Sequence, residues 1–506
     1  MNRTMADTPT EYAMNPDIID AMFGRRKIYT TTEEITRDNV ISEVNAAMGV
    51  HCFNMIEEEF LYWYRRGMQP ILNRTKQVRP EINNKVVENH AAEIVAFKNG
   101  YFLTQPAFYI SRKEDAETNE KVKRLNEYLY LSGKQQADNQ VVDWFHTVGL
   151  GNVYIRGNDD PDVPFKAYAV DPRQSFVVYD RKPGNEPVMG VNVVITGKGQ
   201  EANAEAIFDV FTKNRIFKLR GGMTGRVSTG VPVNGTAIEV IDEQENPLGE
   251  IPIIEYQYEN NRMSAFEATI PLQMAICEAQ SNRLDGIDQF IQSLMVFYNC
   301  QLGEDSNGNP ITPQYIREYG AIFLKSIGQY KADLKILAEQ LDQTQTQVLI
   351  DNLYQQILTI SGMPSTTKGG TSTSDTGAAV LYRDGWYQAD TYARCTEDLF
   401  HTSNRYFDRV MLKILRANTD LDLSLADFEL QFVRNETANL LVKTQAAMNM
   451  KELGFSPELA FAKSGVSNDP VADVENSRKY INLKWGAQDN TEVIDENRVD
   501  EILPVE

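Results

Sequence analysis

The sequence predicts an α+β protein that is mainly α-helical. Three observations support this fold class: apolar residues recur at helical spacing between 36 and 148, short β-rich runs separated by turn residues occupy 152–258, and helical spacing returns from 264 onward. A chain of 506 residues is long enough for roughly two to four domains, each with a core of its own.

The N-terminal part of the chain predicts an arm followed by helices. Residues 1–39 are polar, carry the basic cluster Arg25-Arg26-Lys27, and are expected to pack as an arm on another part of the protein. From Thr36 to Arg66 apolar positions recur mostly at steps of three, four or seven residues, which indicates a helix. Further helices are expected at 84–100, 114–132 and 136–148.

The next part predicts antiparallel β-structure. Eight short runs of strand-favouring residues are separated by breaks that contain turn residues such as Asp-Asp-Pro and Lys-Pro-Gly-Asn. The runs are 152–156, 166–170, 175–179, 188–196, 206–212, 215–219, 235–242 and 251–258.

Two long helices that enclose a small α/β insertion are expected next. Ser264 and Glu267 have the spacing of a capping box, and the apolar face that follows runs from Ile270 to about Val296. The insertion covers 297–329 and includes a strand-like stretch at 320–325. The second helix is expected from Ala332 to Ser361, with an apolar stripe at Leu334, Leu337, Leu341, Val348, Ile357 and Ile360.

A polar loop and a very long helix follow. Pro364 ends the preceding helix, and residues 365–376 have no apolar side chain larger than a threonine methyl, so they predict a loop. Residues 377–417 predict one helix about 60 Å long, with a seam at Tyr392, Cys395, Leu399, Tyr406, Val410 and Ile414. A strand at 428–434, short helices within 436–483 and an acidic tail from 489 complete the expected order.

The charge balance narrows the classes of function. The net charge of −21 argues against a protein that holds nucleic acid by neutralising many phosphates, because that mode needs clustered Lys and Arg. It is compatible with DNA that passes without being held. No apolar run is long enough to span a membrane, and the four widely spaced cysteines predict neither disulfides nor a zinc site.

Catalytic motifs are missing from the sequence. None of the four histidines lies in HExxH, no GxSxG elbow occurs, and the glycine-rich stretches at 197–199 and 220–226 lack the remaining residues of nucleotide-binding motifs. We therefore expect no catalytic residue, no metal and no cofactor. An alternative is a metal-dependent nuclease that uses Asp159, Asp160 and Asp162, although Asp-Asp-Pro-Asp is more typical of a turn.

One region carries a family resemblance. It begins with Ile251-Pro-Ile-Ile-Glu-Tyr and Glu259-Asn-Asn, and continues through Ser281-Asn-Arg-Leu-Asp-Gly-Ile-Asp-Gln-Phe-Ile to Asn299. Together with the two helices, the Gly/Ser/Thr loop and the long helix after it, this region resembles portal (head-to-tail connector) proteins of tailed double-stranded-DNA bacteriophages, most closely the siphophage type. The similar order of elements covers about residues 40–485.

The resemblance implies a ring, usually of twelve subunits, around a DNA channel. Its implied regions are an N-terminal arm at 1–39, a wing at 40–262 with the long helix 377–417 and a strand and connection at 418–434, stem helices at 263–296 and 332–362, a clip at 297–331, a tunnel loop at 363–376, a crown at 435–485 and an acidic tail at 486–506. The apolar helix stripes suit ring contacts, and an ordinary helix pair within one chain explains them equally well.

The resemblance also implies functional residues. The DNA-channel loop would present Lys368, Gly369, Gly370, Thr371 and Ser372. A ring of Lys368 side chains makes one weak phosphate contact per subunit, which favours sliding over binding; a linker with an exposed lysine is the alternative. Basic candidates for the channel wall, or for an outer solvated face, are Arg283, Lys325, Lys331 and Lys335. In the clip, Tyr315, Ile316 and Tyr319 are candidates for contacts with an adaptor or with terminase.

The expected function is structural and not enzymatic. The resemblance implies a portal vertex for genome packaging and ejection, which also initiates procapsid assembly. Its implied partners are other copies of the chain, double-stranded DNA, the terminase large subunit, a head-tail adaptor, and the major capsid and scaffolding proteins, with no membrane. The protein is expected in the virion after assembly in the bacterial cytoplasm. A tail structural protein is a further alternative.

Overall fold

The computed structural model describes most of the chain, in two compact units. The described residues are 24–77, 79–103, 105–113, 115–196, 205–222, 238–291, 294–298, 300–302, 324–326, 333–337, 343–365, 385–432, 440–467 and 473–478. Residues 63–92 and 268–361 belong to one unit, and residues 21–62, 93–267 and those from 362 onward belong to the other. The mixed composition of helices and antiparallel sheets confirms the predicted α+β class.

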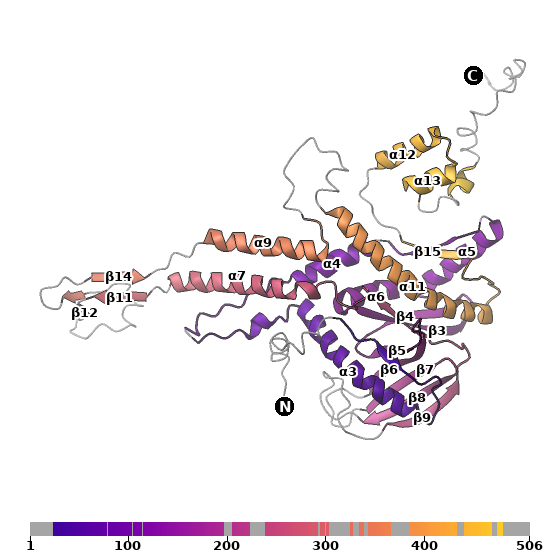
Figure 1. Ribbon diagram of the computed structural model, residues 1–506, viewed down its shortest axis with the longest axis horizontal. Coiled ribbons are helices and arrows are strands. Elements are labelled where there is room, and N and C mark those ends of the chain that lie inside the picture. The colour runs from indigo at the N-terminus through magenta and orange to yellow at the C-terminus, as the bar shows by residue number, and fades with distance from the viewer. Residues whose placement is uncertain are drawn as a thin grey trace, which may run out of the picture. The chain divides into compact units, whose positions relative to one another are not determined.

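The larger unit contains a six-stranded sheet in the order β1-β5-β6-β7-β8-β9. Its strands are β1 (Ile28–Thr30), β5 (Ser175–Asp180), β6 (Pro187–Thr196), β7 (Glu205–Thr212), β8 (Arg215–Gly222) and β9 (Glu239–Glu245). All neighbours pair antiparallel except β1, which runs parallel to β5. The first half of α3 (Val40–Arg65) lies against this sheet (Figure 1). Val40, Val44 and Met48 belong to the same buried cluster as the sheet residues. Residues 28–30, which lie in the predicted arm, pair through β1 with β5.

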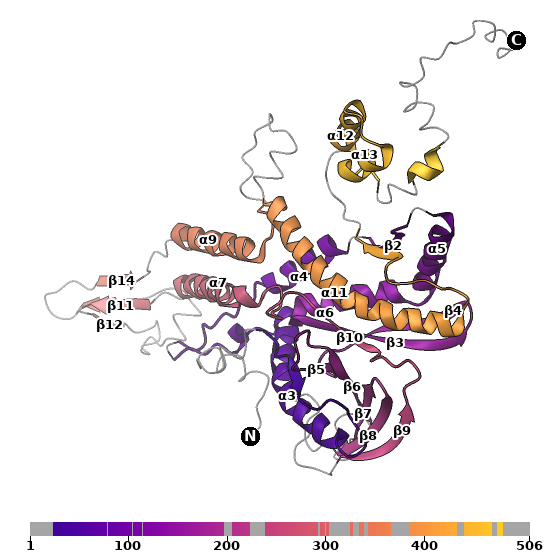
Figure 2. The same ribbon diagram turned by 45° about the vertical axis from the view of Figure 1, so that its right-hand side comes forward.

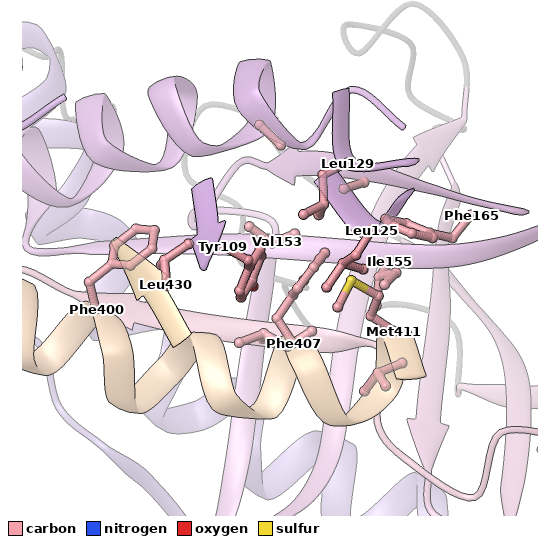
Figure 3. Close-up of a cluster of buried hydrophobic side chains, with 14 of the residues drawn as sticks. Tyr109, Leu125, Leu129, Val153, Ile155, Phe165, Phe400, Phe407, Met411 and Leu430 are labelled. Atoms are coloured by element: carbon pink, nitrogen blue, oxygen red, sulfur yellow. The ribbon is translucent and has the colours of Figure 1, made fainter. Parts of the chain in front are cut away.

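A three-stranded sheet and its helices form the second core of this unit. The sheet order is β10-β3-β4, with β10 (Ile253–Gln257), β3 (Leu150–Asp160) and β4 (Val163–Val170). The helices are α4 (His90–Phe102), α5 (Ala116–Leu131), α6 (Lys134–Val148) and α11 (Trp386–Asn418), and β2 (Phe108–Ser111) pairs with β15 (Phe428–Gln431). Figure 3 shows Phe407 and Met411 of α11 lying against Ile155 of the sheet and Leu125 of α5.

The structure corrects the long helix in two respects. First, α11 begins at Trp386 because Gly385 has a φ of 87°, a left-handed conformation that cannot continue a helix; residues 377–384 lie outside the described part. Second, the predicted seam is rotated. Tyr392 and Cys395 are exposed, whereas the buried stripe runs through Ala393, Phe400 and Phe407. Val410 and Ile414 are buried as predicted.

The smaller unit contains a helix pair and short strands. Helix α7 (Ile270–Ile291) lies beside α9 (Gln343–Ser361), as both views show (Figures 1 and 2). There are also two short 3₁₀ helices, η1 (Pro70–Asn73) and η3 (Glu267–Thr269). Helix η3 directly precedes α7 in the sequence. Strand β11 (Leu294–Tyr298) pairs antiparallel with β14 (Asp333–Leu337), and β12 (Cys300–Leu302) pairs with β13 (Leu324–Ser326).

These strands correct both predicted stem helices. Residues 294–296 were expected at the end of the first helix and 333–337 at the start of the second, but 294–298 and 333–337 form a strand pair. The spacing of Leu334 and Leu337 favours a helix, while the alternation Leu334-Lys335-Ile336 favours a strand, and so short an apolar run does not decide between them. Residues 333–337 form a strand because they pair with β11, whose residues favour β-structure.

The C-terminal part contributes two short helices. Helix α12 (Leu440–Glu452) is followed by α13 (Pro457–Ser464), whose N-cap Ser456 accepts a hydrogen bond from the Leu459 amide. They lie inside the predicted crown. In the described residues no helix combines the length and apolarity needed to cross a membrane.

Candidate channel and assembly site

The predicted channel and clip residues have different positions in the structure. Lys368, Gly369, Gly370, Thr371, Ser372, Lys331, Tyr315, Ile316 and Tyr319 lie outside the described residues. Lys325 is in β13, opposite Gln301, and Lys335 is in β14, opposite Val296. Arg283 lies on α7, where its Nη1 donates a hydrogen bond to Oε1 of Gln347 on α9 at 2.7 Å. Arg283 therefore helps to join the two helices.

Helices α7 and α9 have apolar side chains on two faces. Ile276, Cys277, Ile350 and Ile357 are buried inside the unit. Other apolar side chains of the same helices point to solvent in the single chain: Leu284, Ile287, Val348, Leu349 and Ile360. Val348 is 63% exposed and Leu349 is 53% exposed. Contiguous exposed apolar surface is typical of sites that another protein covers.

A polar segment is fastened along α7 by one carboxylate. Asp285 accepts hydrogen bonds from Arg74 and Lys76, both at 2.9 Å, and from the Asn84 backbone amide at 2.7 Å. Burial raises the pKa of Asp285, but the hydrogen bonds from Asn84 and Lys76 outweigh this effect and hold the pKa below its ordinary value. Sequence reasoning missed this contact, because about 200 residues separate its partners and no local pattern marks them.

A buried arginine explains the basic cluster of the arm. Arg25 lies within ion-pair distance of Glu57 on α3, at 3.1 Å, and of Glu267, at 2.6 Å. Glu57 also pairs with Arg26 at 2.9 Å. Burial raises the pKa of Glu57 to about 7 and that of the neighbouring Glu58 to about 8. Arg25 and Arg26 oppose this effect at Glu57 without outweighing it, so the arm cations compensate the charge of Glu57 only in part.

Both described ends of the 366–384 segment meet helix α11. Before it, Gly362 has a φ of 68°, and a Cβ atom there would lie 2.0 Å from Cδ2 of Tyr392. After it, Gly385 is the N-cap of α11. Tyr392 also lies beside the ammonium of Lys98, 5.6 Å from the ring centroid, and burial lowers the pKa of Lys98 to about 8. Gly362 and Gly385, which flank residues 366–384 in the sequence, are therefore both held at α11.

The aspartates of the nuclease alternative lie at the end of β3 and in the turn that follows it. Asp160 and Val163 pair in the β3–β4 hairpin, and the Asp162 amide donates to Oδ1 of Asp160 at 3.0 Å. The predicted turn is confirmed. Nowhere in the described ranges do three or more His, Cys, Asp or Glu side chains gather in a way that would hold a metal ion.

The chain matches one family of known proteins in sequence. Residues 56–482 match the family model described as phage portal protein, SPP1 Gp6-like. No curated protein sequence matches the chain significantly. A solved structure, the neck of an empty GTA particle computed with C6 symmetry, aligns at 13% identity and a TM-score of 0.40, and the alignment covers 74% of this chain and 90% of that chain. Because the family model spans most of the 506 residues, the chain belongs to the SPP1 Gp6-like family of phage portal proteins.

Proposed function

We propose that this protein forms the ring-shaped channel at one capsid vertex, through which double-stranded DNA enters during packaging and leaves at ejection. The observation that carries the proposal is the family match over residues 56–482. The ring, of about twelve copies, is part of the virion after assembly in the host cytoplasm, and the chain itself does no chemistry.

The exposed apolar side chains of α7 and α9 support a ring. In a closed ring each contact is heterologous, so one patch of a subunit meets a different patch on the next copy. Leu284 and Ile287 on α7, and Val348 and Leu349 on α9, supply two such patches on two different helices. Their burial against neighbouring copies would remove from water the apolar surface that a single chain leaves exposed.

The remaining roles are assigned by region. The clip strands β11–β14 and β12–β13 would dock the terminase large subunit and later the head-tail adaptor, with Tyr315, Ile316 and Tyr319 as contact residues. The wing and crown would meet the major capsid and scaffolding proteins and initiate the procapsid. Lys368 and its neighbours to Ser372 would contact DNA in the channel, and Arg283, Lys325, Lys331 and Lys335 remain basic candidates for its wall.

Native mass spectrometry of the purified chain tests the ring. We expect a closed oligomer of about twelve subunits for the wild-type protein. Leu349→Asp should weaken subunit association about tenfold or more, because a charge would be buried in the contact. Asn352→Asp is the matched control: it adds the same charge to an exposed position on the same helix and removes no apolar surface. A wild-type chain that stays monomeric at micromolar concentration would contradict the proposed function.

A further inference from the structure

A pocket of about 160 Å³ opens beside α11 in the larger unit. Its apolar lining includes Val177 on β5, Ile253 on β10 and Val410 on α11. Ile251, two residues before β10, also lines it. A cavity of about 150 Å³ is large enough to hold a benzene ring. The pocket is therefore sized for one aromatic side chain and is too small for most drug-sized ligands, whose sites begin near about 300 Å³.

The carboxylates that line the pocket already have partners. Glu250 pairs with Lys413 at 2.9 Å. Glu255 pairs with Arg262 and accepts a hydrogen bond from the Tyr179 hydroxyl at 3.1 Å. Glu186 accepts one from Tyr406 at 3.4 Å.

The cations that line the pocket are different. Lys27, Lys213 and Arg409 form no ion pair with a carboxylate among the described residues. Lys27 lies over the ring of Tyr179, 4.1 Å from its centroid, and Arg409 lies 5.2 Å from the centroid of Tyr406. Burial lowers the pKa of Lys27, and the nearby carboxylates of Glu255 and Asp180 oppose this effect without outweighing it. The pocket thus combines a site for an aromatic ring with three cationic side chains that no carboxylate pairs in the described part of the chain.

We propose that this pocket is a contact between consecutive copies of the chain and that it receives an aromatic side chain flanked by a carboxylate from the second copy. The inference rests on the proposed ring. A chain of net charge −21 offers acidic surface to its neighbours, and aromatic side chains are enriched at protein interfaces.

Helix α5 carries a segment with this chemistry. Tyr130 is 69% exposed, the highest value for an aromatic side chain in the described residues. Glu127, one turn earlier, is exposed and has no ion pair within the described ranges. Helix α5 contributes no residue to the pocket, so the pocket and the Glu127–Tyr130 segment are two different patches, as a heterologous contact requires.

Photocrosslinking within assembled rings tests the contact. Ser403 lines the pocket on α11, and p-benzoylphenylalanine at this position should form cross-links in rings assembled from ¹⁴N- and ¹⁵N-labelled subunits. We expect mixed-isotope cross-linked peptides that contain residues 127–131. Rings that give only same-chain cross-links, or cross-links to another segment, would overturn the inference and leave the proposed ring intact. Failure of the unsubstituted protein to form rings would instead contradict the proposed function.

Charge reversal gives an independent measurement. Arg409→Glu and Glu127→Arg should each reduce the ring fraction in native mass spectra about tenfold or more, and the double variant should restore it. Arg405→Glu is the matched control, because Arg405 is exposed on the same helix and does not line the pocket. Circular dichroism checks that each variant is folded. If Arg409→Glu assembles as well as Arg405→Glu, the pocket is not a subunit contact.

Discussion

At the scale of single residues, the fold depends on a few residues that cannot be substituted without loss of stability. Arg25 is buried between Glu57 and Glu267, and Asp285 collects donors from Arg74, Lys76 and Asn84. Removing one member of a buried pair leaves the other charge without compensation, which usually costs more than the pair contributes. Gly362 is a different case, because its backbone conformation and its lack of a side chain are both required.

Gly362→Ala should destabilise the larger unit. The φ of 68° is unfavourable for alanine, and the new methyl group would overlap the ring of Tyr392. We expect a loss of about 1–3 kcal/mol in the free energy of unfolding, measured by urea titration. Gly49→Ala, in α3 where a Cβ atom meets nothing within 4 Å, should instead be neutral or stabilise by up to about 1 kcal/mol. Equal effects of the two substitutions would show that Tyr392 does not restrict Gly362.

At the scale of elements, local sequence patterns predicted most helices and strands, but they did not predict which face of α11 is buried. The helices at α3, α5 and α6 and the strands β3 to β10 lie close to the expected ranges. The face of α11 was wrong, because Tyr392 and Cys395 repeat at helical spacing just as the buried stripe through Ala393, Phe400 and Phe407 does. Which stripe is buried depends on the sheet and helices that α11 meets, and these lie more than a hundred residues away in the sequence.

Substitutions on α11 test the corrected face. Phe407 is fully buried against the three-stranded sheet, so Phe407→Ala should lower the free energy of unfolding by about 3–5 kcal/mol. Cys395→Ala, on the exposed face of the same helix, should change it by no more than about 0.5 kcal/mol. Thermal or urea unfolding of the two variants measures the difference. The reverse order would restore the seam predicted from the sequence.

At the scale of the whole molecule, the acidic charge and the proposed channel are compatible. A net charge of −21 per chain repels DNA from the protein surface, so contact would be confined to a few basic positions at the channel. A ring with one weak phosphate contact per subunit releases few counterions and lets the duplex slide.

A substitution and a deletion within residues 368–374 test the proposed sliding contact with DNA. Lys368→Ala combined with deletion of 371–374 should reduce packaged DNA in a packaging assay severalfold, while native mass spectrometry still shows rings. Lys113→Ala, which removes an exposed lysine paired with Asp427, is the control and should leave packaging unchanged. Normal packaging by the loop variant would contradict a role for Lys368.

The sequence by itself determined the α+β class, the order of the helices α3, α5 and α6 and of the strands β3 to β10, the turn at Asp160 and the resemblance of 251–299 to the portal family. These properties follow from residues that are near one another along the chain, where spacing and turn chemistry act directly. The tertiary structure decided the strand pair 294–298 with 333–337, the buried face of α11, the burial of Arg25 and the pocket at Lys27 and Arg409. Each of these depends on which distant segments meet, because burial and charge compensation are set by spatial neighbours and not by position in the sequence.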